Sequence, residues 1–254
     1  MLLFSKSEGA GVNTLVVLHG LMGSSENWRT IQRALASEIR VICLDLANHG
    51  HSPSAPLFTL ETLSRDVWET LDSLGVKSFF LLGHSMGGKI AMLMASERPE
   101  RVQGLISIDI TPHALKPSHL FILKACQDLA LDKATTRAEL DSELAIYVLQ
   151  PETRAFLLKN VVRDDAGRFF WRVSLENLIA NYAALSDAIE MKQAYTSPAL
   201  LLAGGKSPFH VMRHEAELRQ LFPQITFEVF PEAGHLLHSE APQRFIEVVR
   251  GFLP

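Results

Sequence analysis

The sequence contains little cysteine, no long apolar run and no strong excess of either charge. Its two cysteines, Cys43 and Cys126, allow one disulfide at most, and we expect both to be buried free thiols, as in a reducing compartment. No apolar run approaches the roughly 20 residues that span a bilayer, and the N-terminal MLLFSKSEGAG has too short an apolar stretch for a secretory signal. These absences predict a cytoplasmic protein that does not associate with membranes.

The charge balance and the length narrow the class of protein further. The 254 residues carry a formal net charge of −4, so we expect neither a basic surface for nucleic acid nor an acidic tail. Hydrophobic residues make up 47% of the chain, which suffices for a substantial core. The expected partner is a small-molecule substrate, and the oligomeric state is left open.

Short apolar runs alternate with helical patterns through the first 110 residues. Strands are expected at 14–20, 40–46, 77–83 and 102–109. Helices are expected at 28–37, 60–74 and 86–97. In the second of these helices, apolar residues recur at three- and four-residue steps, which is typical of an amphipathic helix. Strands that alternate with helices predict an α/β fold, with a mostly parallel sheet covered by helices on both faces.

The alternation is interrupted after residue 111. Helical runs are expected at 118–131, 135–149 and 152–160, and a hairpin turn at 165–167. The alternation returns with strands at 197–205 and 225–230 and helices at 211–222 and 240–252. We therefore expect an α/β core made of residues 1–111 and 193–254, and a helical lid made of residues 112–192, inserted between two strands of the sheet.

The string Gly-His-Ser-Met-Gly at residues 83–87 places Ser85 between an expected strand and an expected helix. In this context a Gly-x-Ser-x-Gly string predicts a sharp turn that exposes a nucleophilic serine at the start of a helix. A developing anion is favoured at that helix terminus. The alternative is a glycine-rich turn with an idle serine.

A nucleophilic serine also needs backbone N–H donors for the oxyanion that forms during acyl transfer. We expect the amide of Met86 as one donor and the amide of Leu21 as the other, because HGLMGS at 19–24 follows the first expected strand. Gly20 and Gly23 would let this loop approach a ligand. His19 is expected to hydrogen-bond the loop backbone instead of acting as a base.

The candidate base is His235, which follows the last expected strand in FPEAGHLLHSE. The carboxyl ends of parallel strands converge on one edge of a sheet, where Ser85 is also expected. His238 is the main alternative, and the side chain of His84 is expected to point away from the Ser85 hydroxyl. His49 and the histidine two residues later have a spacing that metal ligands use, but we interpret DLANHGHSP as a turn.

The order of HGLMGS, DLANHGHSP, GHSMGG, SIDITP and PEAGH resembles the α/β-hydrolase fold superfamily over nearly the whole chain. In most members of that superfamily the acid of the triad follows the strand after the lid, where this sequence has Ser207. We expect Asp109 to supply the carboxylate instead, because it ends the neighbouring strand, about 4.8 Å away. Ser207 would then support the pair that Asp109 forms with His235. The alternative for Asp109 is a turn-capping role. The other carboxylates that could then serve His235 are Glu215, the acid nearest to the vacant position, and Glu232.

Together with GGKSPF and FFWRV, these motifs resemble the YbfF-type esterases, a branch of the superfamily with a small lid. Met22 and Ala47 depart from that pattern, which usually has an aromatic residue and an arginine near these positions. The departures concern the lining of the pocket and the support of a loop, so they bear on substrate preference more than on chemistry.

The prediction is a serine carboxylesterase that hydrolyses small acyl esters or thioesters through a Ser-His-Asp triad and an acyl-enzyme intermediate, without metal or cofactor. The alternatives are a carbon–carbon bond hydrolase or lyase on the same fold, and a non-catalytic binding protein. Five apolar lid residues are candidates either to line an acyl pocket or to pack the lid's own helices. They are Leu120, Phe121, Leu144, Tyr147 and Phe156.

Overall fold

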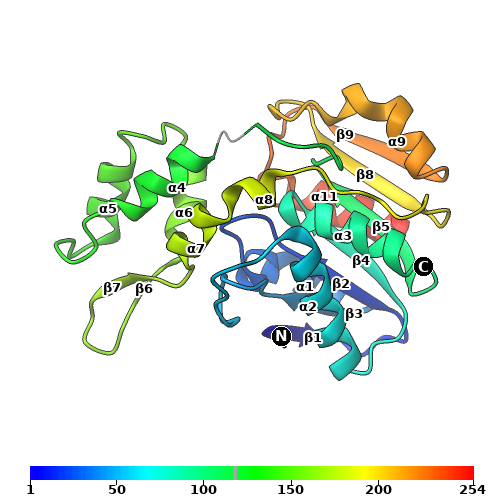
Figure 1. Cartoon of the computed structure of the whole chain (residues 1–254), viewed down its shortest axis with the longest axis horizontal. Coiled ribbons are helices and arrows are strands. Elements are labelled where there is room, and N and C mark those ends of the chain that lie inside the picture. The colour runs from blue at the N-terminus through cyan, green and yellow to red at the C-terminus, as the bar shows by residue number, and fades with distance from the viewer. Residues whose placement is uncertain (117–118) are drawn as a thin grey trace.

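A computed structural model describes residues 1–116 and 119–254, and a seven-stranded sheet organises them (Figure 1). The strands are β1 (Ser5–Glu8), β2 (Thr14–Leu18), β3 (Arg40–Leu44), β4 (Phe79–His84), β5 (Val102–Ile108), β8 (Ala199–Gly204) and β9 (Ile225–Phe230). Their order across the sheet is β1-β3-β2-β4-β5-β8-β9. All neighbours are parallel except β1, which is antiparallel to β3. The expected mostly parallel α/β sheet is therefore confirmed.

The sequence reading missed the edge strand β1. Its residues, SKSE, contain no apolar side chain, so no apolar run marks this strand in the sequence. An edge strand has a neighbour on one side only, so its side chains are not required to be apolar. Apart from β1, each expected core strand is present, with ends shifted by up to two residues.

Helices cover both faces of the sheet. Alternate residues of β2 point to opposite faces, so that Leu15 packs with α1 (Arg29–Leu35) and α11 (Pro242–Phe252). Val16 packs on the other face with α2 (Leu60–Ser73) and α3 (Met86–Glu97). Shorter elements complete the core: η1 (Ser25–Trp28), η2 (Val211–His214), α9 (Glu215–Leu221) and α10 (Leu237–Glu240). Cys43 and Cys126 are buried free thiols, as expected.

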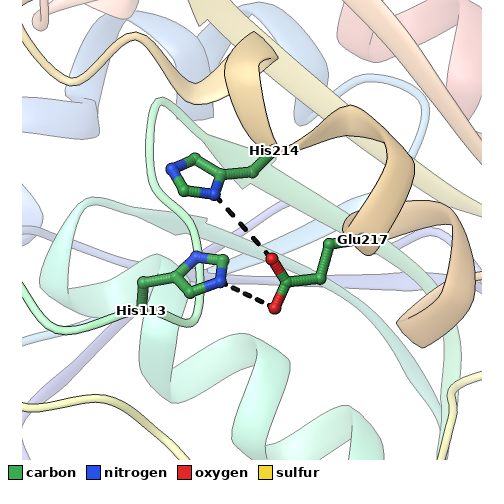
Figure 2. Close-up of side chains that lie close together, drawn as sticks. All are labelled: His113, His214 and Glu217. Carbon is green, nitrogen blue, oxygen red and sulfur yellow. Dashed lines mark hydrogen bonds and ion pairs between the residues drawn. The ribbon is translucent and has the colours of Figure 1, made fainter.

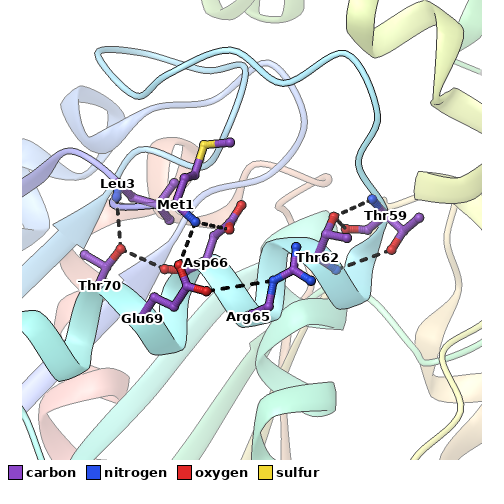
Figure 3. A network of polar contacts seen from close by, with 8 residues as sticks. All are labelled: Met1, Leu3, Thr59, Thr62, Arg65, Asp66, Glu69 and Thr70. Carbon is purple, nitrogen blue, oxygen red and sulfur yellow. Dashed lines mark hydrogen bonds and ion pairs between the residues drawn. The ribbon is translucent and has the colours of Figure 1, made fainter.

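Helix α2 anchors the first residues of the chain (Figure 3). The amino group of Met1 lies 2.6 Å from a carboxylate oxygen of Asp66 and 2.7 Å from one of Glu69. The amide of Leu3 donates to the hydroxyl of Thr70 at 2.9 Å. These contacts hold the segment that precedes β1 against the face of the helix.

Residues between β5 and β8 form a separate group of elements beside the sheet (Figure 1). They are α4 (Leu120–Gln127), α5 (Arg137–Leu144), α6 (Pro151–Leu158), β6 (Val161–Arg163), β7 (Phe169–Trp171), α7 (Leu175–Ala180) and α8 (Tyr182–Ser186). Strands β6 and β7 form the expected antiparallel hairpin. Residue 118, where the first lid helix was expected to begin, lies outside the described residues.

The two ends of this inserted group are hydrogen-bonded to each other. The amide of Leu115 donates to the carbonyl of Ser186 at 2.7 Å, and the amide of Ile189 donates to the carbonyl of Pro112 at 2.9 Å. The chain therefore leaves the core and returns to it at adjacent points. In the described part of the chain, no helix combines the length and the apolar character that crossing a membrane requires.

Candidate active site

Ser85 lies in the turn between β4 and α3, with φ 53° and ψ −119°. Positive φ is uncommon for a residue with a side chain and marks local strain, which is frequent at functional sites. A Cβ atom on Gly83 would lie 2.2 Å from the carbonyl oxygen of Gly87, and one on Gly87 would lie 2.5 Å from that of Leu18. Only glycine allows the strand and the helix to approach this closely. Ser85 is partly exposed, whereas His84 is buried.

His235 lies in the loop after β9 and contacts Asp109, which follows the last residue of β5. The distance from His235 Nδ1 to Asp109 Oδ2 is 2.7 Å. Asp109 is fully buried, while 22% of the His235 side chain is exposed. The amide of Gly204 donates to Asp109 Oδ1 at 3.0 Å, and the hydroxyl of Ser207 donates to Oδ2. The buried carboxylate therefore has three donors that offset its loss of water.

The pairing of β5 with β8 carries Asp109 to this position. Ile108 is in register with Leu202, and the amide of Asp109 donates to the carbonyl of Leu202 at 2.8 Å. The backbone then turns sharply, with φ 52° at Asp109. A carboxylate directly after β5 consequently reaches the loop after β8, where the Ser207 hydroxyl donates to it.

The structure brings the segments of Ser85 and His235 together, but in the described residues no hydrogen bond joins the Ser85 hydroxyl to His235. The contact between the two segments is made by His84, whose Nε2–H donates to the carbonyl of His235 at 2.9 Å. The two imidazole rings are 4.6 Å apart. Burial holds the pKa of His84 well below its ordinary value, so His84 is a neutral donor to the backbone of this loop.

The main alternative base occupies a different environment. His238 is buried and stacks on Trp28 with ring centroids 4.3 Å apart. Burial, with a smaller contribution from the nearby His235, lowers the pKa of His238 to about 3. Its Nδ1 has no hydrogen-bond partner among the described residues. His238 is thus a packed aromatic side chain, and His235 is the histidine that contacts Asp109.

The alternative carboxylates are paired with cations elsewhere. Glu215 accepts from Arg219 at 2.8 Å within α9. Glu232 is highly exposed and lies 2.5 Å from Lys206. Three further side chains that could ligate a metal, those of His113, His214 and Glu217, also lie outside this constellation.

The loop after β2 lies directly beside Ser85. A Cβ atom on Gly20 would lie 3.1 Å from the Cβ of Ser85. Among the described residues, no acceptor is hydrogen-bonded to the amide of Leu21 or of Met86. Both amides are therefore free of a protein acceptor, and their role as oxyanion donors stays a prediction.

Sequence reasoning missed two side chains that hold this loop in place. Met22, with φ 61°, donates its amide to His49 Nε2 at 3.2 Å and accepts from the Asn160 side-chain amide at 2.7 Å. Burial lowers the pKa of His49 to about 3, and its Nδ1–H donates to the carbonyl of Ala47 at 2.9 Å, which leaves Nε2 as the acceptor. The turn at DLANHGHSP was expected, but residue spacing carried no signal that His49 is buried under the loop.

His19 has the structural role that was expected of it. Its Nδ1–H donates to the carbonyl of Gly20 at 2.8 Å, and its Nε2 accepts from the amide of Leu46 at 2.9 Å. Burial lowers the pKa of His19, which keeps the ring neutral.

Comparison with known proteins agrees with this architecture. The family model for the alpha/beta hydrolase fold matches residues 13–242. The chain therefore belongs to the α/β-hydrolase family.

Three similar proteins carry names of ester-hydrolysing enzymes. The mouse sn-1-specific diacylglycerol lipase ABHD11 is 36% identical over 252 residues, which cover 96% of this chain and 82% of that protein. Esterase YbfF of Escherichia coli is 30% identical over 242 residues, covering 94% of this chain and 92% of that protein. The solved structure of a marine microorganism esterase has a TM-score of 0.95 and 32% identity, with 99% of both chains covered. The predicted α/β-hydrolase fold and the resemblance to YbfF-type esterases are confirmed, and the relatives support an ester-hydrolysing enzyme.

Proposed function

We propose that this protein is a serine carboxylesterase that hydrolyses small acyl esters or thioesters through a covalent acyl-enzyme. Ser85 is the nucleophile, His235 the general base and acid, and Asp109 the carboxylate that orients His235. The amides of Leu21 and Met86 form the oxyanion hole.

The observation that carries this proposal is the 2.7 Å contact between His235 Nδ1 and Asp109 Oδ2 at the edge of the sheet that also holds Ser85. This contact fixes the tautomer of His235, with the proton on Nδ1 and the lone pair on Nε2. The vacant acid position after β8 supports the same assignment, because Ser207 there donates to Asp109 and offers no carboxylate of its own.

The reaction begins when Ser85 Oγ attacks the ester carbonyl and His235 Nε2 takes the hydroxyl proton. The Oγ–Nε2 contact is proposed to form when substrate binds, since catalytic hydrogen bonds are often long or misaligned in apo sites. The carbonyl oxygen gains the negative charge, and the two backbone amides stabilise it by about 3 kcal/mol each.

Collapse of the tetrahedral intermediate breaks the bond to the alcohol or thiol, and His235 returns its proton to that leaving group. His235 then removes a proton from water, which attacks the acyl-enzyme, and the released acid leaves Ser85 free. Asp109 stays ionised through the cycle and stabilises the imidazolium. Ser207 supports that charge through its hydroxyl.

The inserted segment 112–192 is proposed to form the lid over this site. Asn160, which directly precedes β6, donates its side-chain amide to the carbonyl of Met22. Met22 lies in the oxyanion loop, residues 19–24, which carries the proposed donor Leu21. The lid is therefore in direct contact with the proposed site. Leu144 is fully buried in the insertion, whereas Phe121 and Tyr147 are exposed by 57% and 53%. We propose that the exposed residues, not Leu144, meet the acyl chain.

The proposal is tested by steady-state hydrolysis of p-nitrophenyl acetate and butyrate, with phenylmethylsulfonyl fluoride as the covalent probe. We expect turnover of both esters, and a sulfonyl adduct that mass spectrometry locates on Ser85. Ser85→Ala should lose activity by about 10³-fold or more and take up no label. Ser54→Ala, at an exposed serine, is the matched control and should behave as the wild type.

An adduct on another residue, or full turnover by Ser85→Ala, would overturn the assignment of the nucleophile. Absence of both turnover and label would favour a non-catalytic binding protein instead. A parallel panel of thioesters and of longer acyl esters then defines the substrate class.

A further inference from the structure

Three metal-ligating side chains converge at a place that the proposed esterase reaction does not use (Figure 2). His113 follows the end of β5, while His214 and Glu217 are one helical turn apart at the start of α9. His113 Nε2 lies 2.8 Å from Glu217 Oε1, and His214 Nδ1 lies 3.9 Å from Glu217 Oε2. The two imidazole rings stack, with centroids 4.3 Å apart.

The separations of these ligand atoms suit one small cation. Zinc binds imidazole nitrogen and carboxylate oxygen at about 2.0–2.2 Å, which places tetrahedral ligand atoms roughly 3.3 Å from one another. The observed separations of 2.8 Å and 3.9 Å lie on either side of that value. All three ligand atoms lie within 4.8 Å of one another, so side-chain shifts of about 1.5 Å or less bring them to the tetrahedral spacing.

The Nδ1 atom of His214 is not committed to a hydrogen bond among the described residues. At 3.9 Å its Nδ1 is beyond hydrogen-bond distance of Glu217, and that nitrogen has no hydrogen-bond partner among the described residues. Figure 2 shows both imidazoles directed at the same carboxylate. The side chains of His113 and His214 are 32% and 40% exposed, so an ion can reach them from solvent.

Thr111 orients the His113 ring from the buried side. Its hydroxyl lies 3.0 Å from His113 Nδ1. When Nε2–H donates to Glu217, this hydroxyl donates to Nδ1; when a cation occupies Nε2, Nδ1–H donates to the hydroxyl instead. A metal-ligating histidine commonly has such a partner on its second nitrogen. Thr111 is compatible with both states, so the ring need not turn on binding.

We infer that His113, His214 and Glu217 bind one divalent transition-metal ion of the zinc class, with water in the fourth position. Two imidazoles and one carboxylate favour zinc over magnesium or calcium, which prefer oxygen ligands. The bound ion joins the segment after β5 to the segment after β8. These two segments also meet at the hydrogen bond between Asp109 and Ser207. The ion therefore links them close to Asp109, the proposed carboxylate of the triad.

The test uses the untagged full-length chain and Zn²⁺ alone. Calorimetry should give one ion per chain, and the melting temperature should rise by about 5 °C or more at a hundredfold excess over Kd. Mg²⁺ at the same concentration should have no effect. Co²⁺ should give the visible absorption of a tetrahedral site, which reports on the ligand set without reference to esterase activity.

Three variants assign the ligands, and a fourth tests the contact of Thr111 with His113. His113→Ala, His214→Ala and Glu217→Gln should each lose the zinc-dependent shift, and Thr111→Val should weaken binding by about 10–100-fold. The matched control is His210→Asn, at an exposed histidine in the same segment, because asparagine tolerates its left-handed backbone with φ 46°. His210→Asn should bind zinc as the wild type does.

Melting curves without metal show whether each variant is folded. A zinc shift that persists in all three ligand variants would overturn the inference, as would saturation at one ion per two chains or the absence of any shift in the wild type. Ester turnover is measured in the same samples without zinc. It shows whether the proposed esterase function holds, independently of whether zinc binds.

Discussion

The α/β core and the inserted segment 112–192 differ in how they contribute to the proposed site. Every group proposed for the chemistry comes from a loop, or from the first residue of α3, at the edge of the core sheet: Leu21, Ser85, Met86, Asp109, Ser207 and His235. The insertion instead exposes large apolar side chains, among them Ile146 at 72% and Leu149 at 77%. On the proposed function, the core determines the chemistry, and we propose that the insertion supplies the surface that bears on substrate choice.

The two regions are nevertheless joined by specific polar contacts. The buried Lys89 on α3 donates to the carbonyl of Asp187 at 2.5 Å, and the Asn160 side chain donates to the carbonyl of Met22 at 2.7 Å. Burial lowers the pKa of Lys89 to about 8. The insertion therefore contacts both the helix that follows Ser85 and the proposed oxyanion loop. We expect substitutions in the core to affect activity more than substitutions in the insertion.

The largest effect is expected from the core. Asp109→Asn should lower kcat for p-nitrophenyl butyrate by about 10³–10⁴-fold, because the amide holds His235 in the wrong tautomer. Its circular dichroism spectrum should remain that of the folded protein. Glu215→Gln and Glu232→Gln are the controls and should retain activity, since these carboxylates pair with Arg219 and Lys206. Near-full activity in Asp109→Asn, with loss in either control, would mean that another carboxylate serves His235.

A smaller effect is expected where the insertion meets the oxyanion loop. Asn160→Ala leaves the carbonyl of Met22 without its donor and should lower kcat by roughly tenfold, a fraction of the 10²–10³-fold cost of losing an oxyanion donor. Asn177→Ala is the matched control, because Asn177 bonds the side chain of Asn48 and not this loop. Equal kcat values for the two variants would show that the insertion does not position the loop.

The smallest effect concerns the buried histidines of the core and appears as a pH dependence of stability. Burial lowers the pKa of His238 to about 3, below its unfolded value of 6.5. The unfolded chain therefore binds more protons, and stability is lost as pH falls from 6.5 toward 3. His238→Phe keeps an aromatic ring stacked on Trp28 and removes one buried histidine whose pKa is lowered.

Urea unfolding at pH 7.5 and pH 5.5 measures this contribution. The loss of unfolding free energy between the two pH values should be smaller in His238→Phe than in the wild type by about 1.4 kcal/mol. An unchanged pH difference would show that His238 is protonated equally in the folded and unfolded states.

The fold was largely predictable because its signals are local. Runs such as TLVVL and FFLLGH are apolar since both faces of their strands are covered, and Gly83 and Gly87 mark the turn at Ser85. The adjacency of Asp109 to the strand after the insertion was implied by the resemblance to the α/β-hydrolase fold, and the pairing of β5 with β8 confirms it. Strand β1 was missed because a polar edge strand carries no such signal.

The supporting contacts of the site were less predictable because they join distant parts of the chain. Asn160 and Met22 are 138 residues apart, and nothing in either segment indicates that a side-chain amide of one bonds a carbonyl of the other. The burial of His49 likewise depends on tertiary packing. The roles assigned to Ser85, His235, Asp109, Ser207 and the two amides, and the division at residues 112–192, stay predictions.

The most direct test of the proposed triad is a crystal structure of the enzyme after reaction with a phosphonate ester, whose phosphorus mimics the tetrahedral intermediate. We predict phosphorus bonded to Ser85 Oγ, the phosphoryl oxygen about 3 Å from the amides of Leu21 and Met86, and Asp109 still bonded to His235. Phosphorus on another side chain, or His235 paired with a carboxylate other than Asp109, would contradict it.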